Sequence, residues 1–231
     1  MKVCVIGANG FLGRNILDGT DWIGVTRKDC DLMKPCDFSE YDCVIHCAAS
    51  LDRQDPKTCY ENILMFENVL KTSKKLIYFS SGAALLGDPP QEPYGLSKWV
   101  IDKRIETLPN VYSLRIWGCY GPGELSTRFS AVCKARGHVV IQRDRYFDFI
   151  DVMDVKKVVK DYVDDKETKK FYNLVYDKKM KLSEWAGFFG ATYEIVEEGL
   201  EQPYASNQNL RKFTYTGLLE YKTFISTSSS L

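Results

Sequence analysis

The chain has 231 residues, 45% of them hydrophobic and 13% aromatic, so it can bury an ordinary core, and this composition excludes an intrinsically disordered protein. Lysine plus arginine equals aspartate plus glutamate at 31 each, and the net charge of zero leaves no basic surplus for nucleic acid or acidic lipid. The start, MKVCVIG, runs directly into a strand pattern, and no apolar run approaches the roughly 18 residues of a membrane-spanning helix, so we expect a cytoplasmic protein.

The eight cysteines are scattered singly through a chain that is large enough to fold without cross-links, so we predict free thiols instead of a disulfide framework. Cys43, His46 and Cys47 are close in sequence. Along a strand, however, the two thiols would stand four residues apart, too far to share one ion. We therefore expect no metal site.

The first half of the chain alternates short apolar runs with helical patterns, which is typical of a parallel sheet with helices on its faces. The expected strands are 2–6, 22–26, 44–47, 76–80 and 111–117. The expected helices are 10–17, 55–74 and 93–107. The connection 28–41 is too short for a full crossover helix, so we predict an irregular segment or a single turn there.

After residue 123 the pattern loosens. Helices are expected at 124–136, 155–163 and 182–189, and extended segments at 139–142 and 171–175. The predicted fold class is α/β, a Rossmann-type doubly wound parallel sheet with a small C-terminal α/β substrate lobe. We place the dinucleotide-binding domain at 1–123 and the lobe at 124–231, partly interleaved with the first domain.

The expected first strand is followed by GANGFLG at 7–13, a glycine-rich run that opens a helix. Glycine suits this place because the turn is tight, the backbone must approach a pyrophosphate, and the helix must pack near the strand. A plain strand-to-helix turn is the alternative. The candidate cofactor-binding residues of this loop are Gly7, Asn9, Gly10, Phe11, Leu12 and Gly13.

An NAD-specific fold would place an acidic residue about twenty positions after the first glycine to hold the ribose 2′-hydroxyl. This chain has Arg27 and Lys28 there, with Arg14 in the first helix. Cations attract a 2′-phosphate, which favours NADP over NAD. A solvated charge pair is the alternative interpretation.

Tyr94 and Lys98 stand four residues apart in YGLSK, which places both on one face of the expected helix. A neighbouring ammonium stabilises a phenolate and brings the tyrosine toward its working range as an acid or base. Ser80 and Ser81 end the fourth expected strand, at the sheet edge where ligands bind, and can hydrogen-bond a substrate oxygen. We therefore predict carbonyl–alcohol redox chemistry.

With these motifs the chain resembles the extended short-chain dehydrogenase/reductases of the NAD-dependent epimerase/dehydratase family, which act on nucleotide-activated sugars. The matching pieces span roughly residues 1–165. They are GANGFLG, HCAAS at 46–50, Asn62, YFSSGA at 78–83, YGLSK, LRIWGCYGPGE at 114–124 and FDFIDVMDV at 147–155. The segment TRKDCDL at 26–32 is most similar to the NADP-using branch that includes dTDP-4-dehydrorhamnose reductase and GDP-fucose synthase.

The resemblance implies that Asp31 and Leu32 flank the adenine and that Ala48, Ala49 and Ser50 line the ribose side. It also implies that Lys98 holds the nicotinamide ribose, so that Tyr94 and Lys98 contact the cofactor as well as the substrate.

Several residues depart from the family pattern. The loop after the serines is one residue longer than usual, so two alignments with the family are possible. If the strand ends are aligned, the reactive hydroxyl is Ser81, whereas Gly82 takes its place if the following glycine is aligned. We favour Ser81. Gly82 and Ala83 provide no acid/base pair for a dehydration. Cys119 and His138 do not match the second acid/base pair of the epimerising synthases. 

Phe147 stands where the family usually has an arginine that grips the substrate diphosphate. We expect one of three other arginines to do so, Arg143, Arg145 or Arg211. Met153 and the aromatic residues near Phe147 could stack on a base, but core packing is the favoured role for them.

The favoured function is NADP-dependent reduction of a 4-keto nucleotide sugar, with Ser81, Tyr94 and Lys98 as catalytic residues. A nucleotide-sugar 4-epimerase with tightly bound NAD and a non-catalytic NADP-binding regulator are the alternatives. The expected partner is the nucleotide sugar, without nucleic acid or membrane. The resemblance also implies a homodimer formed through the helices at 55–74 and 93–107.

Overall fold

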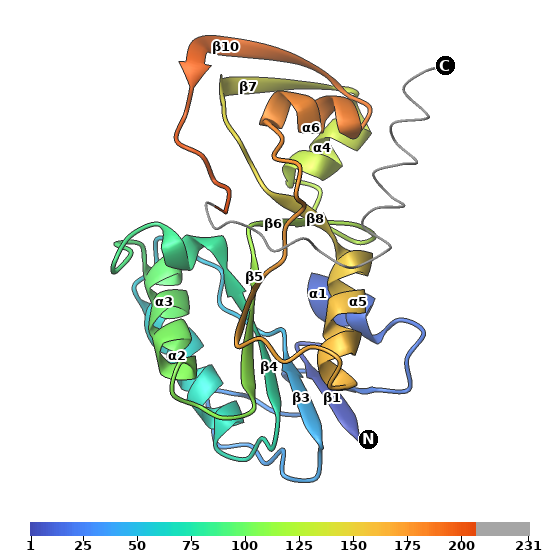
Figure 1. Cartoon of the computed structure of the whole chain (residues 1–231), viewed down its shortest axis with the longest axis vertical. Helices are drawn as coiled ribbons and strands as arrows, with labels where there is room; N and C mark the ends of the chain where they lie inside the picture. Colours follow the sequence, from blue (N-terminus) through green and yellow to red (C-terminus); the bar gives the residue numbers. More distant parts are fainter. Residues whose placement is uncertain (207–231) are drawn as a thin grey trace. The chain divides into compact units, whose positions relative to one another are not determined.

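A computed structural model describes residues 1–206, which form two compact units (Figure 1). The first unit combines Met1–Ile116 with Val155–Leu174. The second combines Trp117–Asp154 with the described residues from Val175 onward. The functional division at residue 123 stays a prediction. None of the helices within residues 1–206 is long and apolar enough to cross a membrane.

The first unit is built on a six-stranded sheet in the order β2-β1-β3-β4-β5-β9, in which every pairing is parallel. The strands are β1 (Val3–Ile6), β2 (Ile23–Val25), β3 (Cys43–His46), β4 (Leu76–Ser81), β5 (Val111–Ile116) and β9 (Phe171–Asn173). The chain runs outward from β1 to β2 and then returns to build β3, β4 and β5 on the other side of β1. This reversal creates the crevice at the carboxyl ends of the strands where Rossmann-type sheets bind ligands. The predicted α/β Rossmann class is confirmed.

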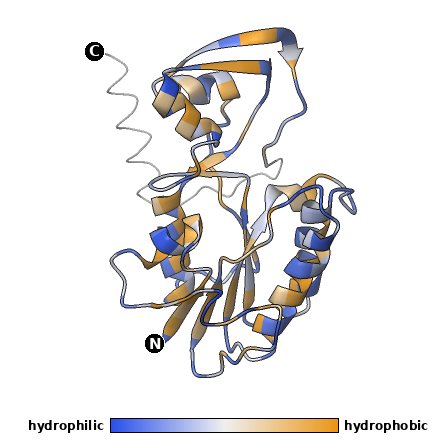
Figure 2. Cartoon of the chain, turned by 180° about the vertical axis from the view of Figure 1, so that it is seen from behind, coloured by the Kyte–Doolittle hydropathy of each residue, from blue (hydrophilic) through white to orange (hydrophobic). Residues whose placement is uncertain are grey.

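Helices cover both faces of this sheet (Figure 1). Those of one face are α2 (Lys57–Leu70) and α3 (Pro93–Ile105), and those of the other are α1 (Phe11–Leu17) and α5 (Val152–Val163). The helix α2 forms because its apolar residues recur every three or four positions, and Phe66 and Val69 are fully buried. They pack in one core with Leu76 of β4 and Ile101 of α3. The strands are mostly hydrophobic, whereas α2 and α3 carry hydrophilic residues as well (Figure 2), as expected for a sheet covered on both faces.

The second unit contains two small parallel sheets, β6 with β8 and β7 with β10. Its elements are β6 (Gly118–Tyr120), α4 (Phe129–Arg136), β7 (His138–Asp144), β8 (Phe149–Asp151), α6 (Leu182–Phe188) and β10 (Thr192–Leu200). Aromatic rings fill its interior. Phe147 stacks on Phe149 with the ring centroids 4.4 Å apart, and the Phe149 ring meets the edge of Trp185. Phe149 therefore packs in the core, the role that the sequence favoured, and the half-buried Phe147 covers it, whereas Met153 is exposed and does not fill that role.

Four elements differ from what the sequence predicted. The helix expected from residue 124 begins at Phe129, because residues 124–128 form turns. The strands β6, β8 and β10 were not expected. The strands β6 and β8 are only three residues long and are defined by their pairing with each other. The strand β10 is exposed along most of its length, so neither an apolar alternation nor a buried run predicts it.

The expectation that all eight cysteines are free is wrong for two of them. Cys30 and Cys36 form a disulfide with their Cα atoms 6.3 Å apart. They come together because the connection after β2 has no helix, as predicted, and folds back on itself instead. The sequence contained no sign of this contact, since it depends on how the irregular loop turns. The other six cysteines are free.

Candidate functional site

The loop between β1 and α1 is a backbone cradle. Gly7 has φ +80°, a conformation that favours glycine, and its N–H donates to the carbonyl of Val25 at 2.9 Å. A Cβ on Gly7 would stand 2.8 Å from the nitrogen of Ala48, and one on Gly13 would stand 2.2 Å from the carbonyl oxygen of Gly7. Only glycine fits at both positions. Both glycines are required by the packing of the turn itself, while Gly10 between them is exposed and leaves its backbone open to a dinucleotide diphosphate.

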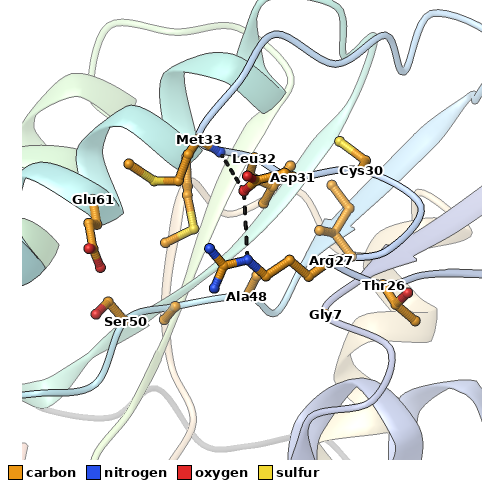
Figure 3. Close-up of a pocket in the computed structure, with 13 residues that line it drawn as sticks. Gly7, Thr26, Arg27, Cys30, Asp31, Leu32, Met33, Ala48, Ser50 and Glu61 are labelled. Carbon is orange, nitrogen blue, oxygen red and sulfur yellow. Dashed lines mark hydrogen bonds and ion pairs between the residues drawn. The ribbon is translucent and has the colours of Figure 1, made fainter.

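A cavity of about 260 Å³ adjoins this cradle at the carboxyl ends of β1, β2 and β3 (Figure 3). The structure brings together here many of the residues that the sequence assigned to the adenosine side of a cofactor. The lining residues are Ile6, Gly7, Thr26, Arg27, Cys30, Asp31, Leu32, Met33, Ala48, Ala49, Ser50, Glu61 and Met65. Six lining residues were not among the predicted site residues: Ile6, Thr26, Cys30, Met33, Glu61 and Met65. The last two stand four residues apart on α2, a spacing that could have indicated a shared face.

The cations expected at the ribose are not equivalent. Arg27 lines the cavity, and its guanidinium lies 3.7 Å from the carboxylate of Asp31 (Figure 3). Its side chain is 85% exposed, so the pair can open easily. Lys28 is exposed and is not among the lining residues. Arg14 donates to the carbonyls of Asn9 and Gly10, both at 3.3 Å, and so braces the glycine loop.

Asn62 of α2 holds the segment after β3 in place. Its side-chain oxygen accepts from the backbone N–H of Ser50 at 2.8 Å, and its nitrogen donates to the Ser50 carbonyl at 3.1 Å. The same nitrogen donates to the hydroxyl of Ser97 at 3.0 Å, and that hydroxyl donates to the carbonyl of Tyr94 at 2.7 Å. One buried amide therefore links the cavity wall to the helix that carries Tyr94.

Tyr94 and Lys98 share one face of α3, which begins with Pro93 in its first turn. The Lys98 Nζ lies 5.5 Å from the centroid of the Tyr94 ring. The guanidinium of Arg53 also lies 5.9 Å from the centroid of this ring. The structure thus brings the expected pair together, while their catalytic roles stay predictions.

The ammonium of Lys98 is buried, with the residue only 2% exposed. Burial lowers the pKa of Lys98 from 10.5 to about 7, because desolvation disfavours the charged form, although Asp102 and Cys47 act in the opposite direction. An amine that titrates near neutrality, beside a tyrosine, is typical of a site for proton transfer.

The two serines at the end of β4 have different surroundings. The Ser80 hydroxyl donates to the carboxylate of Asp102 at 3.0 Å, in a buried group that sequence reasoning missed. The Ser81 oxygen accepts from the N–H of Ala83 at 3.2 Å and caps the 3₁₀ turn η1 (Gly82–Leu85). A Cβ on Gly95 would stand 2.9 Å from the carbonyl of Ala83, so this turn packs against the start of α3. Of the two serines, Ser81 remains our candidate.

The arginines expected to grip a diphosphate have acidic neighbours. Arg143 pairs with Glu197, and Arg145 lies 3.4 Å from Glu201. The Nε of Arg145 is buried without a hydrogen-bond partner among the described residues. Arg211 lies outside the described residues. A role in substrate binding stays a prediction for all three.

A family comparison assigns residues 3–174 to a known model. These residues match the description "NAD dependent epimerase/dehydratase family". The match covers the glycine cradle, the cavity and the Tyr94–Lys98 pair, so one family accounts for all three parts of the site.

Individual proteins are more distant. A putative UDP-glucose 4-epimerase of Methanocaldococcus jannaschii is 26% identical over 179 residues, which are 62% of this chain and 59% of that protein. A dTDP-4-dehydrorhamnose reductase from Yersinia enterocolitica has a similar structure, with a TM-score of 0.72 and 18% identity, covering 98% of this chain and 97% of that one. The structure of RMD from Pseudomonas aeruginosa complexed with NADPH has a TM-score of 0.69 and 20% identity, covering 95% and 92%. The two structures show a shared fold.

Proposed function

Because the chain belongs to the NAD-dependent epimerase/dehydratase family, we propose that it reduces the 4-keto group of a deoxy nucleotide sugar, with NADP as its cofactor and Tyr94 as proton donor. The observation that carries this proposal is the Tyr94–Lys98 pair, which shares one unit with the glycine cradle and the cavity. A family resemblance would not by itself support catalysis, since the same fold hosts several functions.

Each residue of the site has a separate role in the proposed reduction. NADPH, when bound, supplies the hydride. Tyr94 gives its phenolic proton to the substrate oxygen, and the Lys98 ammonium stabilises the phenolate that remains. Ser81 donates a hydrogen bond to the same oxygen and orients the substrate. Gly7 and Gly13 allow the turn to pack tightly, and the exposed backbone at Gly10 admits the cofactor diphosphate.

The proposal is tested with Tyr94→Phe on a 4-keto-6-deoxy nucleotide sugar, by following NADPH oxidation. We expect turnover to fall by about two to four orders of magnitude, because a general acid is lost, while NADPH affinity changes little. Tyr60→Phe, on the exposed face of α2, is the matched control and should behave as the unmodified protein. Full turnover by Tyr94→Phe would overturn the proposal.

The choice of NADP rests on Arg27, which lines the cavity, as opposed to Lys28, which does not. We expect Arg27→Asp to weaken NADPH binding by about ten- to a hundredfold, the value of a hydrogen bond to a charged group, and to leave NADH binding nearly unchanged. Lys28→Asp makes the same change of charge one residue away and serves as the control. Dissociation constants from quenching of protein fluorescence measure both. Equal affinity of the unmodified protein for NADPH and NADH would contradict NADP specificity.

A nucleotide-sugar 4-epimerase is the second candidate, favoured by the 26% identity to the putative epimerase. An epimerase would recycle its cofactor and hold it tightly, so gentle denaturation would release NAD from the purified protein, and UDP-glucose would be converted without consuming NADPH. A reductase would consume one NADPH for each sugar reduced. Action in the cytoplasm, a homodimer and gripping of the substrate diphosphate by Arg143, Arg145 or Arg211 remain parts of the proposal.

A further inference from the structure

The strand β4, which precedes η1, supplies two hydrogen-bond acceptors to Lys98. Its Nζ donates to the hydroxyl of Tyr78 at 2.7 Å and to the carbonyl of Phe79 at 2.9 Å. An ammonium has three N–H donors, so these two bonds leave one for the Tyr94 side of the amine. Both acceptors belong to β4, a fully buried strand, which fixes their positions more firmly than a loop would.

Tyr78 itself has little freedom to move. It is 1% exposed, and its ring makes edge contacts with Phe66 at 5.2 Å and with His46 at 5.6 Å between centroids. The same ring lies 4.5 Å from the Lys98 Nζ. Phenylalanine would fill this core position as well, since the ring supplies all of the packing. The hydroxyl therefore has one evident task, which is to accept a hydrogen bond from Lys98.

We propose that Tyr78 is a positioning residue that fixes the Lys98 ammonium beside Tyr94 and supports its positive charge in a desolvated place. This role rests on the proposed function, in which the charge on Lys98 stabilises the Tyr94 phenolate. Tyr78 acts through Lys98 and does not itself contact the reacting atoms.

The charge on Lys98 depends on the groups around it. From β4 the group is Tyr78; from α3 they are Tyr94 and Asp102; from the end of β3 they are His46 and Cys47. The balance of burial against these groups leaves the pKa of Lys98 at about 7. His46 has a pKa lowered to about 3 and is neutral at that pH, so it neither attracts nor repels the ammonium there. Losing the Tyr78 acceptor therefore changes the charged fraction of Lys98 near neutral pH, where this amine already titrates.

The direct test is an NMR titration of Lys98 in protein labelled at the lysine ε-carbon, with Lys98→Met used to assign its signal. In Tyr78→Phe we expect the pKa of Lys98 to fall by about one unit, because a hydrogen bond to the charged form is lost. Tyr112→Phe is the control. Tyr112 is another buried tyrosine of the same sheet, pairs with Ile77 and packs against Tyr162, so its hydroxyl is remote from Lys98. An unchanged Lys98 titration in Tyr78→Phe overturns the inference.

Turnover adds a second readout. Tyr78→Phe should lower kcat by about tenfold at pH 8 and less at pH 6, since more of Lys98 is charged at the lower pH, while the KM for the sugar changes little. A loss of kcat that is the same at every pH would mean a merely structural role and would also overturn the inference. If Lys98 shifts as expected but Tyr94→Phe keeps full turnover, the proposed function fails while Tyr78 still stands as the support of Lys98.

Discussion

His46 lies at the end of β3 with 1% of its surface exposed, and neither ring nitrogen has a hydrogen-bond partner among the described residues. Burial, with a smaller contribution from the nearby Lys98, lowers the pKa of His46 from 6.5 to about 3. Between these two values the unfolded chain binds a proton that the folded chain does not. The contribution of neutral, buried His46 to the free energy of unfolding is therefore complete above pH 6.5 and is lost as the pH falls toward 3.

His46→Phe should remove this acid sensitivity. Between pH 7.5 and pH 4.5 we expect the free energy of unfolding to fall by about 3 kcal/mol less in His46→Phe than in the unmodified protein. Urea denaturation at the two pH values measures the difference. His138→Gln removes the exposed histidine that meets Thr192, and should retain the full loss. The same loss in His46→Phe and in the unmodified protein would show that His46 is not the responsible group.

At the scale of elements, α3 presents three ionisable side chains along one face. Tyr94, Lys98 and Asp102 follow each other at intervals of four. The Asp102 carboxylate accepts from Ser113 at 2.6 Å and from Arg115 at 2.8 Å on β5, besides Ser80 on β4. Because these buried hydrogen bonds join α3 to two strands, they fix the positions of Tyr94 and Lys98 relative to the sheet edge.

The loop after β2 is the other element that shapes the site, since it carries both Arg27 and the Cys30–Cys36 disulfide. Under oxidising conditions we expect Cys36→Ser to lower the free energy of unfolding by about 2 kcal/mol, because the cross-link restricts the unfolded chain. Cys59→Ser, on α2, should have little effect. Urea denaturation, with a count of reactive thiols, checks the result.

Reduction provides the independent arm of this test. With a dithiol reductant the unmodified protein should match Cys36→Ser, as it would in a reducing compartment, where disulfides are rare. Eight reactive thiols in the untreated, denatured protein would contradict the disulfide.

At the scale of the whole molecule, the chain leaves the first unit after Ile116 and returns to it at Val155. The returning segment supplies most of α5 and the edge strand β9, which pairs with β5. The first unit is therefore discontinuous in sequence. The family match over residues 3–174 ends at the residue where this return is complete.

The sequence by itself determined the features that depend on local chemistry. The glycines at 7, 10 and 13 predicted the cradle, because few other residues allow such a turn. The spacing of Tyr94 and Lys98 predicted a shared helical face, because the helix period is fixed. Apolar runs predicted the central strands to within about one or two residues.

Only the tertiary structure decided which distant groups meet. It placed Tyr78 under Lys98, joined Ser80 to Asp102, paired Cys30 with Cys36, and put Arg27 but not Lys28 at the cavity. Each of these contacts depends on the register of neighbouring strands or the path of an irregular loop. Strand register and loop path depend on packing over the whole unit, so no local pattern of residues predicts these contacts.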